Sequence, residues 1–191
     1  MPLKKIKLIT PNHKSFKRNY IQRMLNDKVS SMKVAKKYEY DYWDGKRKYG
    51  YGGYKYNGSW IDIAKKVIRR YKLNKNSKII DIGCGKGHLI YELSKFLGPK
   101  NIYGLDISKH AIKTSPNKIK KRIRHFDARK NLNYPYKNFD LAISINLIHN
   151  FKINEVKNFI KNIVSISKNS FISTESYRND KELFNLQCWA L

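Results

Sequence analysis

A glycine-rich turn between an apolar run and an amphipathic segment constrains the fold of this chain most strongly. Residues 78–82 (Lys-Ile-Ile-Asp-Ile) have the composition of a short buried strand, and Gly-Cys-Gly-Lys-Gly follows at residues 83–87. Apolar side chains then recur with helical spacing through residues 89–97. A strand that enters a helix through closely spaced glycines predicts a βα unit, in which a ligand can approach the backbone at the start of the helix.

The alternation of strand and helix continues along the rest of the chain. Further strands are predicted at residues 101–105, 123–126, 139–145 and 170–174. Ser59 is expected to cap the helix before the first strand, and Asn154 the helix before the last one. Repeated alternation predicts an α/β fold, a Rossmann-like parallel sheet with helices on both faces. Ligands of such sheets bind at the carboxyl ends of the strands.

Residues 1–60 have a different composition and are predicted as an N-terminal region preceding the domain at residues 61–191. Within it, residues 15–38 show apolar side chains at helical spacing among Lys and Arg, which predicts an amphipathic basic helix. Residues 38–60 hold five glycines and nine aromatic side chains, so a loop segment is expected there. Four of its tyrosines either fold over the cofactor or substrate as a lid or complete the core as an aromatic wrap: Tyr49, Tyr51, Tyr54 and Tyr56.

The formal net charge of +27 points at first to a polyanionic partner. However, 32 of the 41 cations are lysines, and Lys, Asn and Ile, which A/T-rich codons encode, make up 74 of the 191 residues. A biased genome therefore explains much of the charge, whereas proteins that read nucleic acids favour Arg. What remains is a preference for an anionic acceptor or surface, and the 14 acidic residues become informative through their scarcity.

Three of these acids lie at the ends of predicted strands or beside the glycine turn. Asp81 precedes the turn, Asp106 ends the second strand, and Asp127 ends the third, followed by the small Ala128. Asp81 suits a ligand with an ammonium or sulfonium group better than a pyrophosphate. Asp106 stands where a carboxylate can bind both hydroxyls of a ribose. Alternatively, Asp106 caps a helix before Ser108, and Asp127 is a turn or cap residue.

In their order and spacing, these motifs resemble those of class I S-adenosylmethionine-dependent methyltransferases. The matching stretches are residues 81–87, 104–108, 127–128 and 139–144, within a cofactor-binding core of about residues 78–174. The aromatic stretch before them is similar to that of a subgroup of small bacterial members. The resemblance implies S-adenosylmethionine as the cofactor. Its methionine part would contact Asp81, Gly83 and Gly85, its ribose Asp106, and its adenine Asp127 and Ala128.

The chain departs from this family after the fifth strand. The family's sheet has seven strands, the last two in an antiparallel hairpin, whereas here residues 175–191 follow and residues 183–191 have the pattern of a helix. We predict a sheet of about five strands, shortened at its C-terminal end, with the final hairpin missing and an open edge. The N-terminal segment or a homodimer would cover that edge, or the chain is a truncated homologue that binds the cofactor without catalysis.

Methyl transfer from a sulfonium is an in-line displacement that needs orientation and, for some acceptors, a general base. His149, after the fourth strand, is the candidate base because imidazole titrates near neutral pH, with a helix-start or core role as the alternative. Asn146, Tyr51 and Tyr54 are candidates for acceptor binding. We expect a small-molecule acceptor, and the alternative is an RNA-binding or RNA-methylating protein that uses the basic N-terminal region.

The cysteines and histidines indicate no metal site. Cys84 and Cys188 form neither a metal-binding spacing nor a disulfide framework, and four of the histidines share no metal spacing: His13, His88, His110 and His125. No apolar run approaches the roughly 18 residues of a membrane helix, and the first residues lack a signal-peptide pattern. These features predict a cytoplasmic protein without a membrane span.

Overall fold

Five parallel strands form one sheet in the computed structural model, which describes residues 20–25, 27–132 and 137–189. The strands are β1 (Ile79–Ile82), β2 (Ile102–Asp106), β3 (Ile123–His125), β4 (Leu141–Ile145) and β5 (Ser170–Ser173). Their spatial order is β3-β2-β1-β4-β5, so β1, which leads into the glycine turn, lies in the middle. The predicted Rossmann-like α/β fold with a five-stranded sheet is confirmed.

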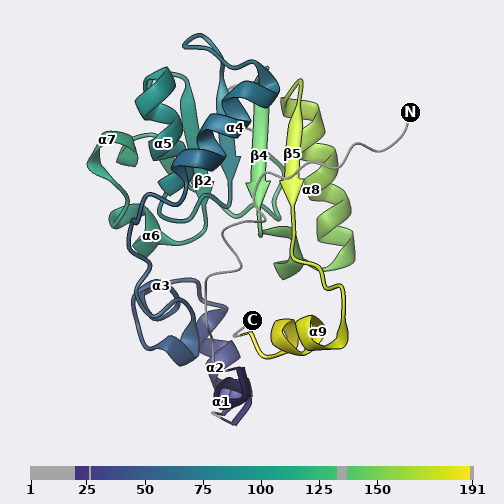
Figure 1. The fold of residues 1–191 in the computed structure, drawn as a ribbon. Helices are drawn as coiled ribbons and strands as arrows, with labels where there is room; N and C mark the ends of the chain where they lie inside the picture. Colours follow the sequence, from purple (N-terminus) through teal and green to yellow (C-terminus); the bar gives the residue numbers. More distant parts are fainter. Residues whose placement is uncertain (1–19, 26, 133–136, 190–191) are drawn as a thin grey trace.

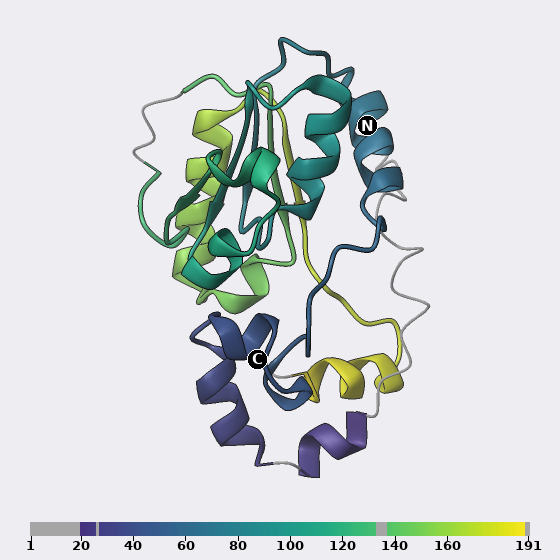
Figure 2. The same cartoon turned by 90° about the vertical axis from the view of Figure 1, so that its left-hand side faces the viewer.

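Helices cover both faces of the sheet, as Figure 2 shows. One face carries α4 (Ile61–Tyr71), α5 (His88–Leu97) and α7 (Asn117–Lys120), and the other carries α8 (Ile153–Ile166). Successive strand residues point to opposite faces, so Ile79 packs with the first set of helices and Ile80 packs with α8. All four residues of β1 are buried, which is typical of the central strand of a parallel sheet.

A separate group of helices lies beyond the carboxyl ends of the strands (Figure 1). It comprises α1 (Tyr20–Leu25), α2 (Lys28–Ala35), α3 (Tyr40–Trp43), a 3-10 turn (Arg47–Tyr49) and α9 (Asp180–Gln187). We call this group, together with the rest of residues 38–60, the cap. Its N-terminal and C-terminal parts meet, because the rings of Tyr51 and Trp189 lie 5.9 Å apart and Lys28 donates a hydrogen bond to the Trp189 carbonyl. On the sheet side, α6 (Lys109–Lys113) follows β2, and a 3-10 turn (Ile148–Asn150) follows β4.

The prediction of a single amphipathic helix at residues 15–38 is wrong. Its first part lies outside the described residues, and the remainder consists of two helices, α1 and α2. The break has a local cause, because the Asp27 carboxylate accepts a hydrogen bond from the Ser30 N–H at 3.1 Å and so caps α2. The apolar residues of α1 do not form a buried face, since Ile21 is 63% exposed and Leu25 is 78% exposed.

Two predicted helix caps are also wrong. α4 begins without a side-chain cap, because Trp60 occupies the N-cap position, and Ser59 lies in the preceding turn, where its N–H donates to the Asn57 side chain at 3.1 Å. α8 begins one residue before Asn154, and there the Glu155 carboxylate accepts a hydrogen bond from the Lys152 N–H at 2.8 Å.

β5 forms one edge of the sheet, and all four of its residues are partly exposed. Beyond β5, the described residues form α9 and no hairpin, as the sequence predicted. α9 begins at Asp180, earlier than expected, because the Asn179 side chain accepts a hydrogen bond from the Glu182 N–H. Among the described residues, no helix combines the length and the apolar character that crossing a membrane requires.

Candidate active site

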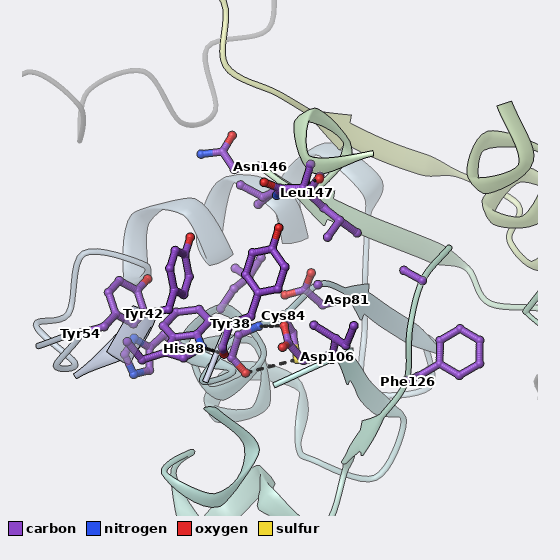
Figure 3. Close-up of a pocket in the computed structure, with 18 of the residues that line it drawn as sticks. Tyr38, Tyr42, Tyr54, Asp81, Cys84, His88, Asp106, Phe126, Asn146 and Leu147 are labelled. Atoms are coloured by element: carbon purple, nitrogen blue, oxygen red, sulfur yellow. Dashed lines mark hydrogen bonds between the residues drawn. The ribbon is translucent and has the colours of Figure 1, made fainter. Parts of the chain in front are cut away.

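A cavity of about 170 Å³ lies at the carboxyl ends of the strands, between the sheet and the cap. The six residues predicted to bind the cofactor all line it: Asp81, Gly83, Gly85, Asp106, Asp127 and Ala128. Three residues predicted to bind the acceptor line it as well: Tyr51, Tyr54 and Asn146. Figure 3 shows Tyr42, Tyr54 and His88 on the left, Asn146 and Leu147 at the top, and Asp81 and Asp106 to the right of the tyrosines.

The glycine turn after β1 is held by its own backbone. The N–H groups of Gly83 and Cys84 donate to the Leu105 carbonyl at 2.8 and 3.1 Å, so they are not free to bind a phosphate. Gly85 has a φ of +56°, and a Cβ at this position would lie 2.5 Å from the Trp43 ring. Glycine is therefore required at position 85, both for the backbone conformation and for the close approach of the cap.

Asp106 is buried and bonded to the glycine turn. Its Oδ2 accepts a hydrogen bond from the Gly85 N–H at 2.6 Å, and its Oδ1 accepts one from the Ser108 N–H at 2.8 Å. Burial raises the pKa of this carboxyl, while the two backbone hydrogen bonds act in the opposite direction. Ser108, rather than Asp106, caps α6. Because a carboxylate accepts about four hydrogen bonds, Asp106 retains capacity for a ligand.

Asp81 is a buried carboxylate without a counter-charge. Its residue is 4% exposed, and no hydrogen bond or ion pair reaches its side chain from the part of the chain that the structure describes. Burial, and to a smaller extent the nearby Asp106, raises the pKa of Asp81 to about 8. Burying an unpaired carboxylate is unfavourable, and a cationic ligand would offset that penalty. The geometry at Asp81 thus favours a ligand with a positive charge.

Acidic side chains anchor the cap to the sheet side. Asp44 accepts a hydrogen bond from Lys86 Nζ at 2.6 Å and lies 2.7 Å from His110 Nε2. Burial raises the pKa of Asp44, but the hydrogen bonds from His110 and Lys86 together bring it below its usual value. Glu39 accepts hydrogen bonds from the first two N–H groups of α6, at 3.0 and 2.8 Å. These contacts fix one end of the cap against the glycine turn and α6.

Trp43 lies at the centre of the aromatic side chains of the cap. Its Nε1 donates to the Tyr38 carbonyl at 2.9 Å and to Ser108 Oγ at 3.1 Å. Its ring stacks on Tyr51 with 5.4 Å between centroids, and Tyr42 packs edge-on against it. Trp43 and Tyr42 are both 8% exposed. The segment therefore packs as a small core of its own while it forms one wall of the cavity.

Tyr54 and His88 form a stacked pair in that wall. Their rings are 4.9 Å apart at an angle of 16°, and the Tyr54 hydroxyl accepts a hydrogen bond from Trp60 Nε1 at 3.1 Å. Burial, and then the neighbouring Lys86, lowers the pKa of His88 to about 4, so its imidazole is neutral at pH 7. Burial raises the pKa values of Tyr54 and Tyr42, and both hydroxyls stay protonated.

Residues 79–170 match a family model described as a methyltransferase domain. Residues 79–170 therefore form a methyltransferase domain. The class I enzymes that its motifs resemble use S-adenosylmethionine as their cofactor. The matched residues run from the first residue of β1 to the first residue of β5, so the model covers the sheet side of the cavity and leaves out the cap.

Curated relatives match parts of the chain. A demethylmenaquinone methyltransferase of Geobacillus stearothermophilus is 36% identical over 62 residues, which are 32% of this chain and 26% of that protein. The protein-lysine N-methyltransferase EFM4 of Saccharomyces cerevisiae is 30% identical over 57 residues, which are 30% of this chain and 25% of that protein. The chain thus spans about a quarter of the length of these relatives.

A solved structure shares the fold of the methyltransferase domain. The S-adenosylmethionine-bound structure of CalS10, an amino pentose methyltransferase from Micromonospora echinaspora, superposes with a TM-score of 0.51. The two chains are 15% identical, and the match covers 62% of this chain and 52% of the other. At this identity the likeness concerns the fold alone.

Within the methyltransferase domain, Asp127 makes the turn contacts that the sequence left as an alternative. Arg129 Nε and Nη2 donate to its two carboxylate oxygens at 2.8 and 2.6 Å, and the Arg129 N–H donates to Oδ1 at 3.1 Å. The Arg129 side chain, which makes the largest contribution, lowers the pKa of Asp127. Any contact between Asp127 and an adenine amino group must therefore be shared with Arg129. The neighbouring Ala128 is buried against the α8 side of the core.

The two candidates after β4 differ in their positions. Asn146 lines the cavity with a φ of +53°, uncommon for a residue other than glycine, and its N–H donates to the Ser173 carbonyl at 2.9 Å. His149 is exposed, lies outside the cavity lining, and has its Nδ1 3.5 Å from Thr174 Oγ1. The cavity therefore offers no support for His149 as the base, and that assignment stays a prediction.

Several lining residues were missed by reasoning from the sequence: Tyr38, Tyr42, Trp43, Trp60, His88, Phe126, Arg129, Asn150 and Phe151. One signal was available, because the scarcity of acids applies to Asp44 and Glu39 as well as to the strand ends. It would have indicated where the cap is anchored. No comparable signal distinguishes Phe126 or Phe151 from an ordinary core residue.

Proposed function

We propose that the protein transfers a methyl group from S-adenosylmethionine to a small-molecule acceptor by in-line displacement. The observation that carries this proposal is the buried Asp81 carboxylate, which lines the cavity together with Asp106 and has no counter-charge in the described residues. S-adenosylmethionine brings an ammonium group, a sulfonium group and two ribose hydroxyls. These are the groups that two carboxylates in a water-poor site bind well.

The roles of the lining residues follow from their chemistry and from the family resemblance. Asp81, with the backbone of Gly83 and Gly85, would hold the methionine part of the cofactor. Asp106 would accept hydrogen bonds from the ribose, in addition to the two that it already accepts from the backbone. Asp127 and Ala128 would lie at the adenine, where Arg129 keeps the Asp127 carboxylate in place.

We further propose that the cap opens for the cofactor to enter. The cavity lies between the sheet and the cap, whose aromatic side chains form one of its walls. The sheet side is held by backbone hydrogen bonds between β1 and β2, so the cap is the wall that can yield. Residues 38–60 would thus act as a lid during entry and as an aromatic wrap over the closed site.

Orientation and exclusion of water are the main contributions that we assign to this chain. Tyr42 and Tyr54 stay protonated, because burial raises their pKa values, so they serve as walls and hydrogen-bond donors rather than as bases. His149 would act as a base only for an acceptor that extends past Asn150 to the rim of the cavity. A cavity bounded by the sheet on one side and the cap on the other favours a small acceptor over a protein or RNA strand.

A cytoplasmic location and a homodimer complete the proposal. Cys84 and Cys188 are both free thiols, which is usual in a reducing compartment. The partly exposed β5 is the sheet edge through which two copies would associate. Size-exclusion chromatography with light scattering tests the dimer, and a monomer at all concentrations would remove it.

Isothermal titration of the full chain with S-adenosylmethionine and S-adenosylhomocysteine tests the proposed function. We expect both to bind, and Asp106→Ala to weaken binding by at least about 100-fold, since hydrogen bonds to a charged group contribute about 1.5–3 kcal/mol each. Asp62→Ala removes an exposed acid of α4 outside the cavity and should leave the affinity unchanged. A folded wild-type protein that binds neither compound would contradict the proposal.

A further inference from the structure

The charges of the cavity are opposite to those of the chain as a whole. The lining includes three carboxylates, those of Asp81, Asp106 and Asp127. Among the lining residues, the only Lys or Arg is Arg129, which is paired with Asp127. His88 adds no charge, because burial and the neighbouring Lys86 lower its pKa to about 4. A chain with a formal net charge of +27 therefore encloses a site whose ionisable groups are mainly acids, and Asp81, whose pKa burial raises to about 8, ionises there when a cation binds.

The pKa values of two groups in the lining, Cys84 and Tyr42, indicate how the site affects a nucleophile that must ionise before it attacks. Burial raises the pKa of the Cys84 thiol well above its usual value, and Asp106 and Asp81 raise it further. Burial also raises the pKa of Tyr42, and the charge of Asp106 adds to that effect. An acceptor that attacks as a thiolate, a phenolate or a carboxylate would meet the same desolvation and the same repulsion.

The rim after β4 presents groups that accept hydrogen bonds from N–H donors. Asn150 Nδ2 donates to the Leu147 carbonyl at 3.1 Å, which leaves the amide oxygen of Asn150 able to accept. Among the described residues, no hydrogen bond reaches the side chain of Asn146, whose backbone is fixed in the left-handed region. Both residues line the cavity and carry no charge.

We propose that the acceptor is an amine, so that the reaction is an N-methylation; this inference rests on the proposed function and specifies its substrate class. The bound ammonium first releases a proton to water. The nitrogen lone pair of the free amine then forms the new N–C bond as the C–S bond breaks and its electron pair passes to sulfur. The positive charge moves from sulfur to nitrogen, and the product ammonium then releases a proton to water. Because the reacting groups remain cationic throughout, Asp81 and Asp106 stabilise them at every stage.

An anionic nucleophile would lead to the opposite result. It would neutralise the sulfonium during the transfer, so that of the two cationic groups of the cofactor only the ammonium would remain beside the buried Asp81 and Asp106. The preference for an anionic acceptor, drawn from the net charge of the chain, is thus reversed by the charges at the site itself. Small amines and the amine of a lysine side chain share the proposed chemistry, and the experiment includes both.

The test compares four ring compounds that differ mainly in their nucleophile: benzylamine, benzyl alcohol, benzyl mercaptan and phenylacetate. Their binding to the full chain loaded with S-adenosylhomocysteine is measured by calorimetry. We expect benzylamine to bind at least tenfold more tightly than the other three compounds. Equal affinities or a reversed order would overturn the amine assignment, whereas failure of S-adenosylhomocysteine to bind would overturn the proposed function instead.

Transfer of a labelled methyl group identifies the reacting atom and the source of the amine. The labelled cofactor is incubated with a metabolite extract and, separately, with a lysine-containing peptide. N-methylated product in either arm supports the proposal, and the arm distinguishes a small amine from lysine. O- or S-methylated product overturns it.

Asn146→Leu provides a readout specific to the acceptor side. We expect this variant to weaken benzylamine binding by about fivefold to tenfold, in line with the loss of one hydrogen bond of about 1 kcal/mol. S-adenosylhomocysteine affinity should stay unchanged. Asn158→Leu, on the exposed face of α8, is the matched control and should alter neither affinity. Equal benzylamine affinities in the two variants would remove Asn146 from the acceptor site.

Discussion

The two walls of the cavity are held together in different ways. On the sheet side, the glycine turn and Asp106 are joined by short backbone hydrogen bonds that continue the β1–β2 pairing. On the cap side, residues 38–60 depend on a few side-chain contacts, chiefly those of Asp44 and Trp43. The sheet wall therefore belongs to the cooperative core, whereas the cap wall can detach at a few separable points.

The largest effect is expected where the two walls touch. Gly85→Ala would place a Cβ 2.5 Å from the Trp43 ring on a backbone with a φ of +56°. Left-handed strain contributes about 1–2 kcal/mol and overpacking about 1–3 kcal/mol, so we expect a destabilisation of about 4 kcal/mol. Thermal unfolding followed by calorimetry measures it.

Two further variants separate strain from collision at this contact. Gly98→Ala, at a φ of +81° with no atom within 4 Å of the added Cβ, should show the strain alone. Trp43→Phe removes the colliding atoms of the cap, so the double variant with Gly85→Ala should be at least about 1 kcal/mol more stable than additivity predicts. Strict additivity would mean that the two walls are not coupled through these residues.

The second-largest effect is expected at Asp81, which lowers the free energy of unfolding when no ligand is bound. Asp81 has a pKa of about 8 when folded and near 4 when unfolded, so the unfolded state ionises first as the pH rises. The loss of folding stability caused by burying Asp81 is therefore absent below pH 4 and grows as the pH rises to 8. Asp81→Asn should therefore raise the stability by on the order of 3 kcal/mol at pH 8, and by little at pH 4.

The same substitution should weaken the binding of S-adenosylmethionine. Wild-type affinity for S-adenosylmethionine should fall about tenfold for each pH unit below 8, since the cation pairs with ionised Asp81. Asp81→Asn should bind weakly and lack this slope. Melting temperatures and titrations at several pH values measure both effects. A variant that is less stable than wild type at pH 8 would contradict the account of Asp81 as an uncompensated charge.

The smallest effect tests the anchor of the cap. Asp44→Asn leaves Lys86, whose side chain is 7% exposed, without its carboxylate partner, and we expect a loss of about 1–2 kcal/mol. Because the partners of Asp44 lower its pKa, its contribution is present above pH 4 and is lost as the pH falls further. Hydrogen exchange should quicken in residues 38–56 and stay slow in β1. Equal acceleration in both would contradict the separation of the walls.

The sequence predicted the sheet wall well because its parts are local. Asp81 and Gly85 belong to one strand–turn–helix unit, and Asp106 ends the next strand, so the rules for parallel sheets bring them together. The contact of Trp43 with Gly85 could not be predicted, since it joins residues whose separation no periodic pattern specifies. Asp127 shows a second limit, because a local Arg129 engages a carboxylate that the family pattern assigns to a ligand.

The contact between Trp189 and the N-terminal part of the cap affects the order in which the two walls of the cavity fold during synthesis. The sheet can form once β5 has left the ribosome, but the cap lacks its C-terminal partner until residues 180–189 follow. Lys28 and Trp189 are 161 positions apart, so this joining closes a very long loop and comes late. In a nascent chain, the sheet wall with Asp81 and Asp106 would thus form first, and the cap would pack against it afterwards.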